Sequence, residues 1–221
     1  MKIDFHIHSR HSGDAGLKPE QIIGLSKEKG IIPALTDHNT CDGWKETKKQ
    51  SKSQKWPFIQ GEEIKVYSGS NYLGELLGLF MQNPVKKGQL WDVLDALEEQ
   101  DAFISVPHPF DYLRKPLLYS FKALDEIVSE VHAVEVFNSR CRFNFPNKLA
   151  ERYAAEHGKP FTAGSDAHFP VELGNAYVEV EASDLEEARK KILKRKCSFS
   201  GKISPWKVHN YTTLVKLGLM K

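Results

Sequence analysis

Two histidines near the start of the chain have the spacing of a metal-binding pair. His6 and His8 lie two residues apart, and the apolar residues Ile3, Phe5 and Ile7 alternate with polar ones around them. Successive side chains of a strand point to opposite faces, so this pattern predicts a strand that presents both imidazoles on one face. There they could reach a single ion. A His-x-His pair alone is more often structural, so the prediction depends on ligands from later segments.

Residues of ligand type recur where later segments that resemble strands come to an end. Together with the first pair, they are His6, His8, His38, Glu63, His108, Asp166 and His168. Any one of them could be structural, but seven at successive strand ends are hard to explain in that way. Because the strand ends of a closed barrel meet at one rim, where barrel enzymes have their active sites, we predict a metal centre there.

The segments around these residues alternate between strand and helix. Strands are expected at 2–8, 31–36, 64–67, 72–80, 102–106, 133–137, 161–163 and 176–180, the third and fourth as a hairpin. Helices are expected at 19–29, 42–54, 89–100, 121–131 and 146–157, after a capping box at 183–186, and on an apolar stripe from Val208 to Leu219. This order favours an α/β fold with a parallel sheet that closes into a barrel. We expect a single domain over 1–221, with 198–221 as a C-terminal helix docked on it.

Composition narrows the classes of partner. The chain has 221 residues, of which 40% are hydrophobic, and a net charge of +2, so neither a membrane nor a nucleic acid is indicated. The lysine-rich stretches 45–55 and 189–196 could follow a nucleic acid backbone, but solvated helix faces explain them better. Three scattered cysteines suit reduced thiols, and the sequence contains no apolar span of membrane length and no leader before His6. We therefore expect a cytoplasmic protein.

A cluster of histidines and carboxylates suits hydrolysis of a phosphate ester by divalent metal ions. Two ions about 4 Å apart can clamp a phosphoryl group, and one of them lowers the pKa of bound water to about 7, which supplies a metal-bound hydroxide as nucleophile. The ions also neutralise charge on the equatorial and leaving oxygens. Asp166 or His168 could assist the proton of the leaving group, or metal-bound water could do so instead.

Five motifs, taken together and in this order, resemble the PHP (polymerase and histidinol phosphatase) family. They are His6-Ile7-His8, Thr36-Asp37-His38-Asn39, Gly61-Glu62-Glu63, His108-Pro109 and Gly164-Ser165-Asp166-Ala167-His168. The resemblance implies a phosphoesterase with a distorted seven-stranded (β/α) barrel and three divalent metal ions at its C-terminal rim. It also implies three sets of ligands: His6, His8, Glu63 and Asp166 for the first metal; Glu63, His108 and Glu75 for the second; and Asp14, His38 and His168 for the third. Glu63 would thus bridge two metals, and we count it among the catalytic residues.

Two of these positions depart from the strictest family pattern. Glu75, in the segment Gly-Glu-Leu-Leu-Gly, stands where many members have histidine, and Asp14 stands where some do. Carboxylates make a site harder and shift its preference from zinc towards manganese or iron, so any of these three metals could be bound. Glu75 could also be an ordinary strand residue that faces solvent.

Substrate contacts are expected from residues that follow strand ends. Arg140 is the first choice, because its guanidinium could fork onto a phosphate directly after a strand, and Asn138 and Arg10 are further candidates. Each could equally be solvated. The expected substrate is a phosphorylated small molecule, a nucleotide or the end of an oligonucleotide.

Two other functions remain open from the sequence. The chain could be a non-catalytic metal-bound module that acts in a partner complex, although such modules usually lose several ligands. It could also hydrolyse amides, but that chemistry usually brings a metal-bridging lysine, and no lysine ends a predicted strand in a matching place.

Overall fold

Seven strands of the computed structural model wrap into a nearly closed barrel, in the order β1-β2-β3-β4-β6-β7-β8. Six of them run parallel, and β4 runs antiparallel to both of its neighbours. The structure describes residues 1–114 and 121–219. The barrel strands are β1 (Lys2–Ile7), β2 (Ile31–Leu35), β3 (Ile59–Ser68), β4 (Asn71–Leu79), β6 (Phe103–Val106), β7 (Ala133–Asn138) and β8 (Phe161–Gly164). The prediction of a distorted seven-stranded barrel is confirmed.

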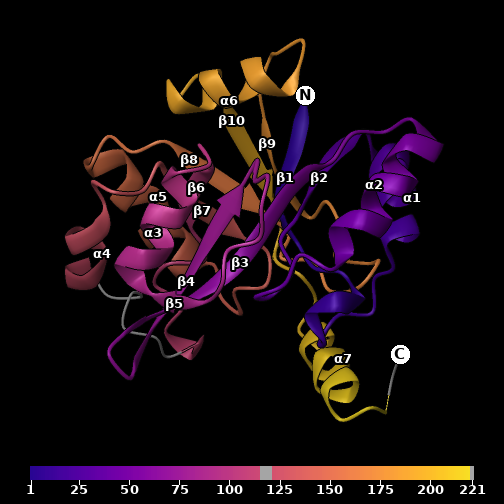
Figure 1. The fold of residues 1–221 in the computed structure, drawn as a ribbon, viewed down its shortest axis with the longest axis horizontal. Helices are drawn as coiled ribbons and strands as arrows, with labels where there is room; N and C mark the ends of the chain where they lie inside the picture. The colour runs from indigo at the N-terminus through magenta and orange to yellow at the C-terminus, as the bar shows by residue number, and fades with distance from the viewer. Residues whose placement is uncertain (115–120, 220–221) are drawn as a thin grey trace.

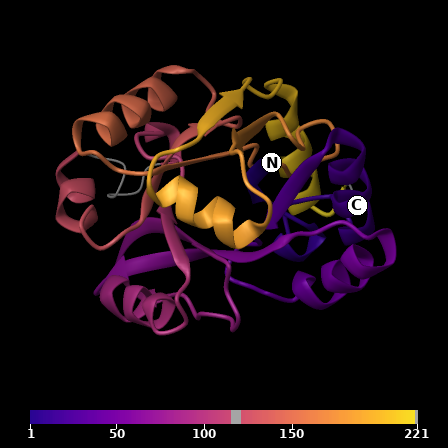
Figure 2. The ribbon, with the colours of Figure 1, turned by 90° about the horizontal axis from the view of Figure 1, so that it is seen from above.

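The helices lie outside the barrel or across its ends (Figure 1). Those between barrel strands are α1 (Pro19–Lys29), α2 (Gly43–Gln54), α3 (Leu90–Glu98), α4 (Phe121–Ile127) and α5 (Phe145–Glu156). Figure 2 shows α6 (Leu185–Leu193) lying across the end at which β1 begins. In Figure 1, α7 (Lys207–Lys216) lies at the opposite end, the rim at which the parallel strands finish. The remaining elements are β5 (Gly88–Gln89), β9 (Ala176–Glu179), β10 (Ser198–Gly201), η1 (Arg10–Ser12) and η2 (Tyr112–Arg114).

The barrel closes where β8 meets β1, and only glycine fits at the contact. A Cβ atom on Gly164 would collide with the Cβ of His6 and would lie 2.8 Å from its backbone nitrogen. Just beyond this point, the backbone N–H of His8 donates to the carbonyl of Ala167 at 2.9 Å. The missing side chain therefore lets the end of β8 approach His6 of β1 and His8, which directly follows it.

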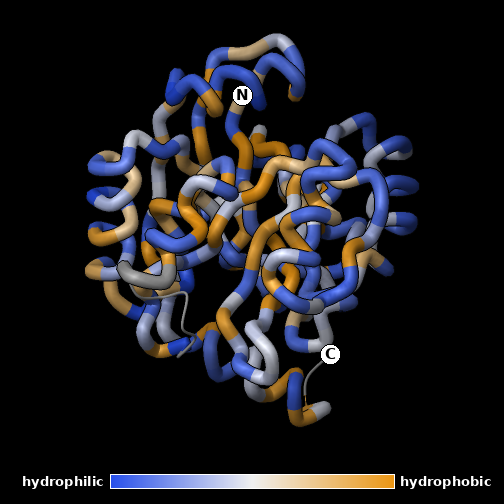
Figure 3. Tube along the Cα trace, turned by 60° about the vertical axis from the view of Figure 1, so that its left-hand side comes forward, coloured by the Kyte–Doolittle hydropathy of each residue, from blue (hydrophilic) through white to orange (hydrophobic). Residues whose placement is uncertain are grey.

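A β-bulge divides β1 into an apolar half and a half that carries ligands. Phe5 and His6 together oppose a single residue of β2. As a result, Ile3 and Phe5 pack in one hydrophobic cluster, while Ile7 packs in the other. The prediction that these three apolar residues share a face is wrong for Ile7, because the extra residue reverses the alternation. Figure 3 shows apolar residues gathered along the central strands and polar ones along the outer helices.

Several predicted elements have different ends. Strand β3 continues through Glu63 to Ser68, so Glu63 lies inside a strand and not at its end, because neither glycine nor proline interrupts the residues that follow. Helix α6 is capped one residue later than expected, by Asp184, whose side chain accepts from the backbone N–H of Glu187 at 2.8 Å. Helix α4 ends at Ile127, before the predicted end at 131. The side chain of Phe121, on the predicted stripe, is outside the described residues.

The C-terminal segment is more than the predicted helix. Residues Ser198–Gly201 form β10, which pairs antiparallel with β9, and β9 pairs antiparallel with β1. Val208 of α7 is buried as expected, but Leu219 lies past the helix and is exposed. Residues 220–221 of the predicted tail are outside the described residues. Within 1–114 and 121–219, no helix has the length and apolar character needed to cross a membrane.

Candidate metal centre

His6 of β1 and His8 just after it meet Glu63 of β3 and Asp166, which follows β8, at the bottom of the site, and we call these four residues the inner set. Nε2 of His6 lies 3.4 Å from Oε1 of Glu63 and 3.7 Å from Oδ1 of Asp166. Nε2 of His8 lies 3.5 Å from Oε2 of Glu63 and 3.3 Å from the same oxygen of Asp166. All four side chains are buried. The residues predicted for the first metal are therefore brought together.

Glu63 is shared with a second group of residues. Its Oε1 lies 2.9 Å from Nε2 of His108, and Oε2 of Glu75 lies 3.8 Å from the same nitrogen. Glu75 is buried, so the alternative in which it faces solvent is wrong. Burial and the charge of Glu63 raise the pKa of Glu75. A divalent ion between these three residues would favour the ionised form of Glu75.

Asp14, His38 and His168 lie nearer the surface, and we call them the outer set. The two oxygens of Asp14 lie 3.5 Å from Nε2 of His38 and 3.4 Å from Nε2 of His168. The side chain of His38 is 21% exposed, whereas none in the inner set exceeds 1%. Nδ1 of His38 also lies 2.7 Å from Oε2 of Glu63, so the two sets adjoin.

Glu135 of β7, which was not predicted from the sequence, holds the inner set from behind. Its Oε1 accepts from Nδ1 of His6 at 3.1 Å, and its Oε2 accepts from the backbone N–H of His108 at 2.7 Å. A proton on Nδ1 leaves Nε2 of His6 unprotonated and directed at Glu63, the tautomer that binds a metal. A lone carboxylate in the apolar strand AVEVF was the available signal.

Six buried atoms of the inner and outer sets form no well-aligned hydrogen bond within the described part of the chain, and they face one another instead, as Nδ1 of His38 and Oε2 of Glu63 do at 2.7 Å. They are Nε2 of His6 and of His8, Oδ1 of Asp14, Nδ1 of His38, Oε2 of Glu63 and Oδ1 of Asp166. A buried polar atom without a well-formed hydrogen bond costs about 1–3 kcal/mol, so six that crowd together require an explanation. Imidazole nitrogens and carboxylate oxygens are ligands of Zn²⁺, Mn²⁺ and Fe²⁺. Triplets of such atoms lie within 4.8 Å of one another, so the residues present fit metal ions.

The charges of the inner set suit the same role. Burial lowers the pKa of His8 to about 3, which keeps its imidazole neutral. Burial opposes the ionised form of Glu63, but the charge of His6 outweighs it and holds the pKa of Glu63 well below its usual value. The pKa of Asp166 is likewise held low against burial, by His6 and Arg114. Burial opposes a charge on His6, but the carboxylates of Asp166, Glu135 and Glu63 outweigh burial and raise the pKa of His6 well above its usual value, so a metal ion would bind there in place of a proton. The neutral imidazole of His8 and the two ionised carboxylates are already in the forms that bind metals.

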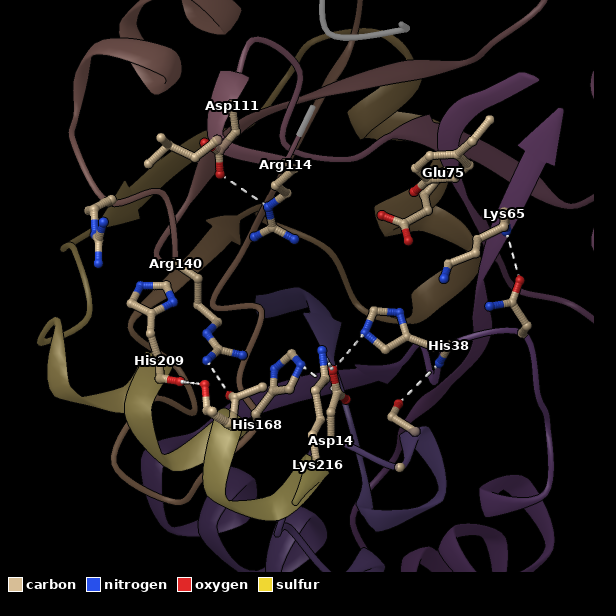
Figure 4. Close-up of a pocket in the computed structure, with 18 residues that line it drawn as sticks. Asp14, His38, Lys65, Glu75, Asp111, Arg114, Arg140, His168, His209 and Lys216 are labelled. Carbon is tan, nitrogen blue, oxygen red and sulfur yellow. Dashed lines mark hydrogen bonds and ion pairs between the residues drawn. The ribbon is translucent and has the colours of Figure 1, made fainter. Parts of the chain in front are cut away.

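An open pocket of about 850 Å³ lies against the outer set (Figure 4). Five lysines and arginines of the described chain line it: Lys65, Arg114, Arg140, Arg142 and Lys216. Arg114 donates to Oδ2 of Asp166 at 2.6 Å, which links the pocket to the inner set. Arg114 was not predicted from the sequence, because it lies in η2, well beyond the end of β6. The excess of positive charge favours an anionic ligand.

The three predicted substrate contacts lie in different surroundings. Asn138 is buried and donates to Oδ2 of Asp166 at 3.2 Å, so it supports a ligand. Arg140 lines the pocket but is itself buried, with Nε 3.1 Å from Glu172. Arg10 is 47% exposed and pairs with Glu46 at 3.0 Å, and it is absent from the described lining of the pocket. The structure therefore gives no support to a substrate role for Arg10.

Known proteins resemble this chain in both sequence and fold. Residues 144–197 match the family described as PHP_C, PHP-associated, a segment that includes Asp166 and His168. The chain is 39% identical over 192 residues to the uncharacterized protein MJ0417 of Methanocaldococcus jannaschii. The aligned region covers 85% of this chain and 73% of that protein. The chain belongs to the PHP family.

Solved structures share the fold of this chain at low sequence identity. A two-domain protein from Bacteroides vulgatus that contains a predicted PHP-like metal-dependent phosphoesterase has a TM-score of 0.74 at 17% identity, over 96% of this chain and 69% of that one. A Bifidobacterium adolescentis protein assigned by prediction as a metal-dependent phosphoesterase has a TM-score of 0.66 at 17% identity, over 87% and 96%. An amidohydrolase from Chromobacterium violaceum with bound sulfate has a TM-score of 0.62 at 16% identity, over 90% and 98%.

Proposed function

We propose that this PHP protein is a metal-dependent hydrolase of phosphate esters. The observation that carries the proposal is the set of six buried ligand atoms that face one another without well-formed hydrogen bonds, next to a pocket lined by cations. The proposed substrate is a phosphorylated small molecule, a nucleotide or the end of an oligonucleotide, because such a ligand brings the phosphate that both features suit.

Three divalent ions, of manganese, iron or zinc, would be held by this chain. The proposed ligands are the inner set for the first ion, Glu63 with Glu75 and His108 for the second, and the outer set for the third. When bound, such ions polarise phosphoryl oxygens and lower the pKa of water. Glu63 would connect the first two positions, because it lies within 3.5 Å of histidines from both.

The remaining residues would bind and orient the phosphate. Arg114 would direct its guanidinium towards the phosphoryl oxygens while it keeps Asp166 in place. Arg142 and Lys65, which line the same pocket, would add positive charge around the ligand. Asp166 and His168 are proposed to act closest to the leaving group, where either could assist its proton.

The test is to purify the protein without chelator, measure bound metal per chain, and assay phosphomonoesters and phosphodiesters with added Mn²⁺. We expect metal to be bound and a phosphate ester to be hydrolysed, and we expect an Asp166→Ala, His8→Ala double variant to lose both properties. Absence of metal, or turnover that survives the double variant, would refute the proposal. Bound metal with no turnover of any ester would favour a non-catalytic module, and turnover of an amide alone would favour an amidohydrolase.

A further inference from the structure

The C-terminal helix α7 is joined to a buried arginine behind the outer set. A terminal nitrogen of Arg140 donates to Oγ1 of Thr212 at 2.7 Å and to the carbonyl of Val208 at 3.4 Å. Both acceptors belong to α7, and Val208 is fully buried. Arg140 therefore uses part of its guanidinium to hold α7 against the rim of the barrel, as Figure 4 shows.

The opposite side of Arg140 reaches the loop that carries His168. Its Nε lies 3.1 Å from Oε1 of Glu172. The other oxygen of Glu172 accepts from the backbone N–H groups of His168 and Phe169, each at 3.1 Å. Glu172 is fully buried, so without Arg140 its charge would lack its compensating partner. The ring of Phe169 also meets the edge of Tyr211 on α7, at 5.6 Å between centroids.

Lys216 of α7 reaches the outer set from the pocket side. Nζ of Lys216 lies 3.2 Å from Oδ2 of Asp14, and the lysine side chain is 61% exposed. Asp14 also contacts His38 and His168, so this ammonium lies beside the atoms that would hold the third ion. A cation at this distance competes with a metal for the same carboxylate.

We infer that α7 sets the metal affinity of the outer set, in two opposite directions. Arg140 and Glu172 are positioning residues that fix the loop of His168 and so strengthen binding of an ion, while Lys216 weakens it by occupying Asp14. The inner set lies on strands and in a buried turn, so it does not depend on this helix. The inference rests on the proposed three-ion centre.

The test measures Mn²⁺ binding to the full chain by titration, with bound metal per chain measured in parallel. Arg140→Met should weaken the weakest of the three binding steps by about 10–100-fold, the range found when groups that orient a metal ligand are removed. Thr212→Val, which removes only the shorter of the two hydrogen bonds from Arg140 to α7, should weaken the same step by about threefold. Arg140→Lys should recover part of the loss. Arg189→Met is the matched control, because Arg189 forms a close ion pair with Asp101, away from the pocket lining.

Lys216→Met should change the Mn²⁺ affinity of the weakest step in the opposite direction. It should tighten the same step by about twofold to fivefold, since a largely exposed ion pair contributes little, and it should leave the other two steps unchanged. Should Arg140→Met fail to fold, Thr212→Val and Lys216→Met still decide the question, because neither leaves a buried charge unpaired.

The outcomes separate this inference from the proposed function. Three ions in the unmodified chain, with selective and opposite shifts at the weakest step, support it. Three ions with that step unchanged in Thr212→Val and Lys216→Met overturn the inference alone. Fewer than three ions in the unmodified chain contradict the proposed centre and, with it, the inference.

Discussion

The inner and outer sets use the same kinds of ligand, but they are held in different ways. Of the inner histidines, His6 lies on β1 and is oriented by Glu135 from behind, and His8 directly follows β1 with its Nδ1 3.0 Å from Oγ of Ser12. The outer residues lie in loops, and His168 depends on Glu172 and Arg140 for its position. The inner atoms are enclosed by the barrel, whereas His38 and Asp14 border the open pocket. This difference indicates that the barrel itself fixes the positions of the inner ligands, whereas the positions of the outer ligands can change without disturbing the barrel.

Glu63→Gln should have the largest effect, because Glu63 contacts histidines of both sets. We expect phosphoesterase kcat/KM to fall by about 10³-fold, equal to about 4 kcal/mol of transition-state stabilisation, together with a loss of bound metal. The measurements are steady-state kinetics and metal content. A variant that keeps its metal and its rate would remove Glu63 from the centre.

Glu135→Gln tests how the inner set is oriented. The amide can no longer accept hydrogen bonds from His6, His108 and Asn138 as strongly, so metal affinity should fall by about 10–100-fold. The readout is titration of Mn²⁺, and Glu130→Gln, at an exposed position near the end of α4, is the control. Equal affinities for the two variants would contradict the role assigned to Glu135.

Asp14→Asn tests the independence of the outer set. It should remove about one ion per chain and lower kcat/KM by about tenfold, while the inner ions remain, because Asp14 lies in a separate loop. Metal content after gel filtration distinguishes the outcomes. A simultaneous loss of all ions would mean that the two sets form a single cooperative site.

Metal removal should also separate the sets through stability. At about 100-fold excess over the dissociation constant, one bound ion stabilises the fold by about 2.7 kcal/mol, so each ion that a chelator removes should lower Tm by roughly 5–10 °C in a chain of this size. Thermal unfolding with and without Mn²⁺ measures this. Asp14→Asn should keep most of the shift, and Glu63→Gln should lose most of it.

Arg10→Ala should have the smallest effect. Its pair with Glu46 is largely exposed and contributes less than about 1 kcal/mol, and it is outside the described pocket lining. We expect kcat/KM to change by less than about twofold. A large rise in KM would restore Arg10 as a substrate contact.

Local pattern was sufficient for most of the fold and for the proximity of the predicted ligands. Alternation placed His6 and His8 together, and apolar runs with glycine and proline stops located most strands. What the pattern does not contain is contact between side chains from remote loops. Arg114 and Lys216 reach the site from segments with no ligand motif, and the link from Arg140 through Glu172 to His168 joins three separate segments. The bulge in β1 was also missed, because it depends on pairing with β2.

That bulge has a consequence for how the protein can change. In a regular strand, the face that points into the barrel would be apolar along its whole length, and the imidazoles would point towards the helices outside. Because of the single additional residue at Phe5 and His6, the side chains that point into the barrel change from apolar packing residues to metal-ligand residues from one position to the next. A deletion of one residue there would reverse the side-chain alternation of the residues that follow. The barrel could still form, but the histidines would point out of it, towards the helices.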